Sequence, residues 1–314
     1  MKKLTSLILA YLVLVMPVHA ERYALASGES PIIGQLTITS TRFDDTFIKL
    51  AHEFGVGYQE LIIANPNVDP WLPGEGTQVV MPTQYILPDA KRDGLVLNLA
   101  EMRLYYYPKS SQGSPQYVHT YPISIGRQGW DTPLGETRII RKKKLPTWYP
   151  PKSIREEYRQ KGKTLEAAVP PGPDNPLGKY ALYLGLPSYV IHGTNEPRGI
   201  GMRVTHGCIR LHPDDIKDLF SRISIDTPVT IVNQPYKTAR YRNRLYAEMH
   251  PDQGEGSRPG SNLHQLVQAV SGVKDPEHGF DVDWQLATRL AKAKTGLPTV
   301  VGIMQSNEHT GVEN

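Results

Sequence analysis

One segment, from Ala181 to Leu211, constrains the fold of this chain more than any other. It opens with an apolar and aromatic run that ends at Ile191 and has the composition of a buried strand. His192 follows at once, so the sequence predicts an imidazole at the end of a strand, where side chains meet a cleft. A turn-rich stretch then leads to Cys208, which is the only cysteine among 314 residues.

A thiol beside an imidazole is the minimum equipment for covalent acyl transfer, because the imidazole can take the thiol proton and later deliver one to a leaving group. Gly193 and Gly207 allow a substrate to approach the backbone closely, and backbone N–H groups around 206–208 are candidate donors to an oxyanion. Directly after this site, Pro213 and the apolar face of 211–220 predict a helix. The alternative is structural, since a lone cysteine is most often a small buried hydrophobe.

The local pattern resembles the L,D-transpeptidases, whose YkuD-type catalytic domain has a histidine, a spacer and then Ser/Thr-His-Gly-Cys. In this chain the pattern reads His192-Gly193 followed by 205–210, and the arginine at its end matches the enterobacterial-type branch. The resemblance extends over residues 93–234 and implies a mainly β fold, a β-sandwich. It implies these roles: Cys208 is the nucleophile, His192 is the proton acceptor and donor, His206, Gly207, Gly193 and Thr205 line the oxyanion region, and Arg210 either binds a substrate carboxylate or braces the loop.

The strand pattern of this region also favours a sandwich over a parallel sheet, because its strands are short and dense. Alternating segments recur at 95–107, 118–125, 137–140 and 226–232. Between 141 and 178 the chain has no clear period, and it carries a basic run at 141–144 together with aromatic residues and prolines. Loops this long are usually lids or binding loops, so we expect an insertion that covers the cleft at Cys208. A solvated basic face is the alternative for the charged run.

Residues 36–83 read as a small unit of their own, with the order strand, helix, helix, strand. Phe47 and Leu50 begin the apolar face of the first helix, for which Asp44 or Asp45 is the expected cap. With the segment ANPNVDPWLPGEGTQVVMP, the unit resembles a LysM domain, which binds the glycan of peptidoglycan. A packing domain that only supports the catalytic one is the alternative.

Residues 1–20 have the features of a secretion signal. Lys2 and Lys3 precede an apolar stretch, and the end of the segment, Val-His-Ala, resembles a cleavage site. We therefore expect export to the periplasm, with Glu21 as the first mature residue and no membrane span after cleavage; a membrane anchor is the alternative. The formal net charge of +4 gives no reason to expect a nucleic-acid partner. An exported cysteine without a partner cysteine points to a reactive thiol.

Residues 235–314 form an extension of unknown role, which we expect to be α/β. A strand at 244–249, a Gly/Ser-rich linker at 254–260 and helices at 263–270 and 283–294 account for its sequence pattern.

The resemblance thus implies a periplasmic enzyme that acylates Cys208 with the tetrapeptide stem of peptidoglycan at its third residue, releases D-Ala and passes the acyl group to an amine. The acceptor stays open between diaminopimelate, which gives a 3–3 cross-link, a lysine of an outer-membrane lipoprotein, and water. Two rivals are a non-catalytic cell-wall binder and a papain-like peptidase, whose cysteine precedes its histidine. No metal or cofactor is expected, because no Cys/His cluster has zinc-ligand spacing and no glycine-rich phosphate loop occurs.

Overall fold

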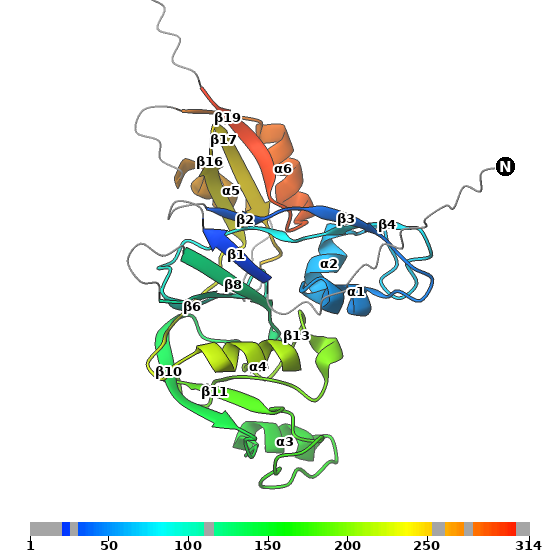
Figure 1. Cartoon of the computed structure of the whole chain (residues 1–314), viewed down its shortest axis with the longest axis vertical. Coiled ribbons are helices and arrows are strands. Elements are labelled where there is room, and N and C mark those ends of the chain that lie inside the picture. Colours follow the sequence, from blue (N-terminus) through cyan, green and yellow to red (C-terminus); the bar gives the residue numbers. More distant parts are fainter. Residues whose placement is uncertain (1–20, 26–30, 110–115, 253–260, 273–278, 306–314) are drawn as a thin grey trace, which may run out of the picture.

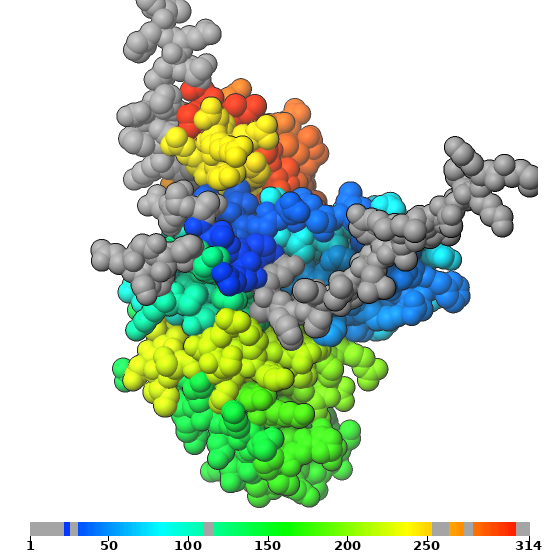
Figure 2. All heavy atoms as spheres, viewed as in Figure 1, coloured from blue at the N-terminus to red at the C-terminus, as the bar shows by residue number. Residues whose placement is uncertain are grey.

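The computed structural model describes residues 21–25, 31–109, 116–252, 261–272 and 279–305. They form a β-rich central body, an N-terminal unit that projects from its side and a C-terminal unit at one end (Figures 1 and 2). The expected secretion signal and the Gly/Ser-rich linker lie outside the described residues. Within the described ranges, no helix is long and apolar enough to cross a membrane.

The central body is built on a sheet of nine strands, as far as the structure describes the chain, and most neighbours in it are antiparallel. In sheet order the strands are β1 (Glu21–Leu25), β8 (Gln116–Pro122), β7 (Arg103–Tyr107), β6 (Gly94–Asn98), β15 (Pro228–Val232), β10 (Gly135–Lys144), β11 (Tyr180–Leu184), β12 (Val190–His192) and β14 (Ile209–Arg210). The pairs β15–β6 and β12–β14 are parallel. A separate short pair joins β9 (Ile125–Gly126) to β13 (Arg203–Thr205).

Strand β10 belongs to both halves of this sheet. Its first residues pair with β15 and its later ones with β11, with a register shift between Ile139 and Arg141. The ribbon curves around the body at this point (Figure 1), which is the usual effect of a bulge. Apolar side chains from both halves and from α4 (Pro213–Arg222) form one core. The predicted mainly β, sandwich-type fold is confirmed.

Two predictions about the strands of the body are wrong in detail. The expected continuous strand 181–191 is broken by a turn between β11 and β12, because Pro187 lacks an N–H and Ser188 adopts a φ of 72°. The basic run 141–144, assigned to the insertion, continues β10 and pairs with β11. All four charged residues of this run are exposed or only half-buried, so they extend the strand without burying a charge.

The N-terminal unit has the predicted order of elements. They are β3 (Thr37–Ser40), α1 (Phe47–Glu53), α2 (Tyr58–Ala64) and β4 (Gln78–Met81), and β3 pairs with β4 around a small apolar core of its own. The predicted cap of α1 is wrong: the Thr46 hydroxyl accepts from the Lys49 N–H at 3.3 Å, whereas Asp45 accepts from the backbone of Arg42. Strands β2 (Ile32–Gly34) and β5 (Gln84–Ile86) pair beside this unit.

The C-terminal unit is a sheet with two helices and its own core. Its strands, in sheet order, are β16 (Tyr236–Tyr241), β17 (Arg244–Met249), β19 (Thr299–Met304) and β18 (Phe280–Val282), and its helices are α5 (Ser261–Gly272) and α6 (Trp284–Ala293). The predicted strand at 244–249 and both predicted helices are present. Strands β16, β18 and β19 were not predicted, because their short runs mix polar and apolar residues without strict alternation.

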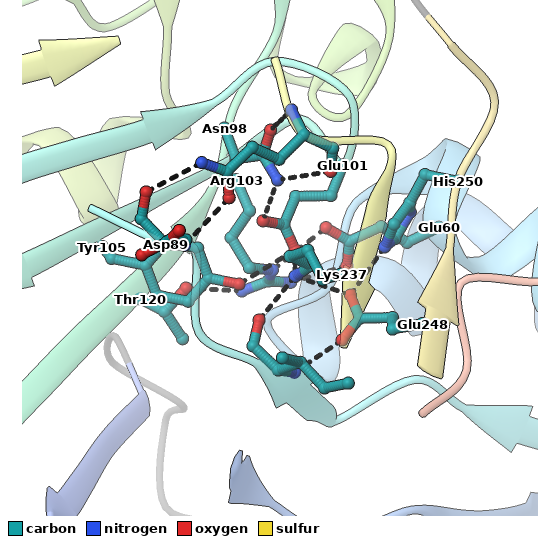
Figure 3. Close-up of polar contacts among 12 residues, drawn as sticks. Glu60, Asp89, Asn98, Glu101, Arg103, Tyr105, Thr120, Lys237, Glu248 and His250 are labelled. Carbon is teal, nitrogen blue, oxygen red and sulfur yellow. Dashed lines mark hydrogen bonds and ion pairs between the residues drawn. The ribbon is translucent and has the colours of Figure 1, made fainter. Parts of the chain in front are cut away.

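A buried network of charged side chains joins the three units (Figure 3). The Lys237 ammonium contacts Glu101 and Glu248, both at 2.7 Å, and donates to the Ile86 carbonyl at 2.6 Å. These residues come from β16, the turn after β6, β17 and β5, so a single cation ties the C-terminal unit to the central body. Next to it, Arg103 of β7 pairs with Glu60 of α2 at 2.6 Å and fixes the N-terminal unit.

Candidate active site

Strands β12 and β14 bring the predicted catalytic residues together. In their parallel register Ile191 faces Ile209 and His192 faces Arg210. Cys208 directly precedes β14, so the same pairing places it near the end of β12 that carries His192. These three residues line one cavity of about 1200 Å³. The local pairing of two short segments thus assembles the site.

His192 is buried, with only 3% of its surface exposed. Its Nδ1 lies 2.6 Å from the carbonyl oxygen of Gly193, and since a carbonyl can only accept, Nδ1 carries the proton. The other nitrogen, Nε2, is then the one with a free lone pair. Burial, followed by the charge of Arg210, lowers the pKa of His192 to about 3. The imidazole is therefore neutral at physiological pH and able to accept a proton.

The thiol of Cys208 is half-buried and forms no disulfide. Its Sγ donates to the carbonyl of Ser188 at 3.6 Å. Burial raises the pKa of Cys208, against smaller lowering effects of the Val190 backbone and Arg210. Cysteine and histidine are thus both neutral in the free protein, so the thiolate must form when the thiol reacts.

The loop before Cys208 holds its shape through Thr205. The Thr205 hydroxyl accepts from the Gly207 N–H at 3.2 Å and donates to the Cys208 carbonyl at 2.6 Å. Gly207 has a φ of 96°, which favours glycine at this position. The N–H groups of Gly207 and Gly193 are both already donated, the second to Tyr180. The N–H groups of His206 and Cys208 have no hydrogen-bond partner within the described chain, and they remain the candidate oxyanion donors.

His206 lines the cavity but is occupied by other side chains. Its Nε2 lies 2.9 Å from Glu157 and 3.1 Å from Arg127, and its ring meets the Trp130 ring edge-on. Hydrogen bonds, first from Arg127, lower the pKa of Glu157 to about 2 and keep it negative. These contacts favour a role for His206 in fixing the loop, while its predicted place in the lining of the oxyanion region stays a prediction.

Glu157 was not singled out from the sequence. It lies on α3 (Lys152–Gln160), inside the segment predicted to be a structureless insertion. The only signal for this helix is the short amphipathic pattern around Ile154, which faces the cavity. The contact between Glu157 and His206 ties the insertion to the loop that carries Cys208.

The amino-acid sequence matches the family model of the L,D-transpeptidase catalytic domain, YkuD, over residues 92–231. The chain belongs to the L,D-transpeptidase family. Three curated relatives carry the name probable L,D-transpeptidase. ErfK/SrfK of Salmonella typhimurium is 43% identical over 88% of this chain and 89% of its own, YbiS of Escherichia coli K12 is 40% identical over 89% and 91%, and YcfS of the same strain is 37% identical over 96% and 94%.

These relatives match the chain far beyond the catalytic domain, so the N-terminal and C-terminal units are shared with them. Among solved structures, L,D-transpeptidase 3 from Mycobacterium tuberculosis aligns with a TM-score of 0.33 and 17% identity, over 45% of this chain and 60% of that one.

In this L,D-transpeptidase the insertion forms one wall of the cavity. Trp148 and Tyr149 line it together with the start of α3, and Arg141 and Lys143 of β10 line it as well. The predicted role of the insertion in covering the cleft fits this arrangement. The basic side chains come from the sheet, however, and only the aromatic ones from the insertion.

We expect alkylation of Cys208 by iodoacetamide to accelerate with pH through and beyond the usual range of a thiol, because its pKa is raised. Arg210→Met should slow alkylation at neutral pH, since the guanidinium favours the thiolate. Arg198→Met removes an exposed arginine and should change nothing. Intact-mass spectrometry across the pH range measures both effects. A reactivity plateau at neutral pH would instead mean a preformed thiolate–imidazolium pair.

Proposed function

We propose that this chain is a periplasmic L,D-transpeptidase that acts on peptidoglycan stem peptides. Cys208 is acylated at the third residue of a tetrapeptide stem, D-Ala leaves, and the acyl group passes to an amine. The observation that carries the proposal is the meeting of a thiol, a neutral imidazole and a guanidinium in one cavity, on a chain that belongs to this family.

The first half-reaction follows from the protonation states. His192 Nε2 takes the proton of the Cys208 thiol as the sulfur attacks the carbonyl carbon. The negative charge that develops on the carbonyl oxygen is stabilised by the Cys208 N–H. The C–N bond then breaks, His192 returns its proton to the amine of D-Ala, and a thioester remains on Cys208.

Arg210 supports recognition of an anionic peptide. Its Nε is buried and has no hydrogen-bond partner within the described residues, and leaving such a donor unpaired is costly. A substrate carboxylate would satisfy it with a charge-assisted hydrogen bond. This favours substrate binding over a purely structural brace for Arg210. The stem peptide carries carboxylates, and Arg141 and Lys143 offer further cations along the same cavity.

In the second half-reaction an amine attacks the thioester and His192 again accepts and donates the proton. A diaminopimelate side chain would give a 3–3 cross-link, and a lysine of an anchored lipoprotein would give a protein–peptidoglycan link. Both acceptors share the residues of the first half-reaction, so the choice depends on the shape of the open cavity.

The N-terminal unit is proposed to hold the glycan as a LysM-like module. It exposes large apolar side chains, which is typical of a surface that packs against sugar rings: Phe43, Trp71 and Leu72 are 86%, 58% and 80% exposed. The signal-like residues 1–20 would deliver the protein to the periplasm, where peptidoglycan lies.

Intact-protein mass spectrometry of the reduced chain with a disaccharide-tetrapeptide tests the proposal. We expect an adduct that lacks the terminal D-Ala in the wild type and none in Cys208→Ala, whose melting temperature serves as the control for folding. Added diaminopimelate should discharge the adduct. Discharge by water alone would indicate an L,D-carboxypeptidase. No adduct and no D-Ala release with a free thiol would overturn the mechanism in favour of a non-catalytic peptidoglycan-binding protein.

A further inference from the structure

Two clusters of potential metal ligands occur in the described part of the chain, and only one of them already pairs with a cationic side chain. The first, Glu101, Glu248 and His250, is buried, and the Lys237 ammonium already lies between its carboxylates. The second consists of His52, His212 and Asp214 at the contact between the N-terminal unit and the central body. No cationic side chain pairs with this second cluster within the described residues.

From this second cluster we infer that His52, His212 and Asp214 bind a zinc ion that fastens the N-terminal unit to the catalytic domain. The donor set is two imidazoles and one carboxylate, which suits zinc and leaves a fourth position for water. Sequence spacing gives no sign of this site, because His52 lies on α1 whereas His212 caps the start of α4.

The geometry brings the three donors together. The rings of His52 and His212 lie 4.0 Å apart between centroids, and His212 Nδ1 is 3.7 Å from the Asp214 carboxylate. One ligand atom from each residue lies within 4.8 Å of the others. Tetrahedral zinc holds its ligand atoms about 3.4 Å apart, so the cluster must contract slightly. His52 and Asp214 are exposed and free to make that adjustment.

The histidine pair lacks another explanation. The His52 imidazole has no hydrogen-bond partner in the part of the chain that the structure describes. His212 accepts only a long hydrogen bond, 3.4 Å, from the Asp214 N–H. Two neighbouring imidazoles beside a carboxylate, one without a hydrogen-bond partner in the described chain and the other with only this long one, offer the nitrogen ligands that a zinc ion prefers.

Contacts independent of the metal preorganise the site. The backbone N–H groups of Tyr58 and Gln59 donate to the carbonyls of Ile200 and Gly201 at 3.4 and 3.2 Å, so α2 already rests on the loop that precedes Cys208. The cluster also borders a cavity of about 250 Å³ between the two units, which gives room for the zinc-bound water. Zinc bound there would add a cross-link close to the catalytic loop.

The experiment is a titration of the full chain with zinc chloride by isothermal calorimetry, after treatment with a chelator. It is done in the Cys208→Ser background, because a thiolate is itself a zinc ligand. We expect one zinc ion per chain and a higher melting temperature with zinc, since the ion binds the folded state. His52→Gln and Asp214→Asn should each weaken binding by about a hundredfold or more, and His264→Gln, at an exposed position of α5, should not. Magnesium should not compete, because it avoids imidazole.

Two results would overturn the inference. One is the absence of any zinc site tighter than the weak binding of isolated surface histidines. The other is a stoichiometric site whose affinity His52→Gln and Asp214→Asn leave unchanged, which would place the ion elsewhere. Because the readouts are affinity and melting temperature of a Cys208→Ser protein, they do not depend on the transpeptidase reaction.

Discussion

Replacing His192 with glutamine is expected to slow acylation of Cys208 by about a thousandfold. Glutamine is similar in size and can keep a hydrogen bond to the Gly193 carbonyl, but it cannot accept the thiol proton. The loss should be large because the raised pKa of Cys208 leaves little thiolate at neutral pH. Single-turnover release of D-Ala from a tetrapeptide stem measures it.

The pH dependence distinguishes a lost proton acceptor from a distorted site. In His192→Gln, acylation should recover steadily as pH rises, because hydroxide forms the thiolate without help from the imidazole. The wild type should show no acid limb near the usual histidine pKa, since that of His192 is lowered to about 3. His264→Gln, a surface change on α5, is the matched control. Wild-type rates in His192→Gln would refute the role of proton acceptor.

The catalytic pair could be predicted from the sequence because its signal is local. His192 and Cys208 lie on two short segments that pair directly, and the glycine-containing turn between them restricts the geometry. The contacts around this pair could not be predicted from the sequence. Glu157 approaches His206 from a helix in a segment without a clear period, and only the folded chain brings their side chains together.

The burial of Lys237 and Glu248 could not be predicted from the sequence either. Lys237 and Glu248 are charged residues within two short strands, and charged positions in a strand normally indicate a solvated face. Their burial depends on Glu101, which comes from a turn more than a hundred residues away. The two outer units could be outlined from their own apolar patterns, but not the network that joins them to the catalytic domain.

Removing the cation from this network should have a large effect on stability. Lys237→Met is expected to lower the free energy of unfolding by about 3–5 kcal/mol. The ammonium is 2% exposed and contacts two carboxylates that are themselves buried. Without it, Glu101 and Glu248 would lie close together in a buried site with no ammonium between them. Urea denaturation measures the loss, with Lys292→Met on the exposed side of α6 as the control.

The reason for this cost is the pair of carboxylates left behind, which gives a further test. Adding Glu101→Gln to Lys237→Met should recover part of the stability, because it removes one of the two facing charges. The cost of Lys237→Met should also shrink at acid pH, where the unpaired carboxylates take up protons.

In the wild type, burial disfavours the charged form of Lys237, but Glu101 and Glu248 outweigh this effect and raise the pKa of Lys237. On the alkaline side, its contribution is therefore retained up to the ordinary lysine pKa and is lost as pH rises through the raised value. A Lys237→Met protein as stable as Lys292→Met would mean that packing of the apolar cores, and not this cation, holds the C-terminal unit in place.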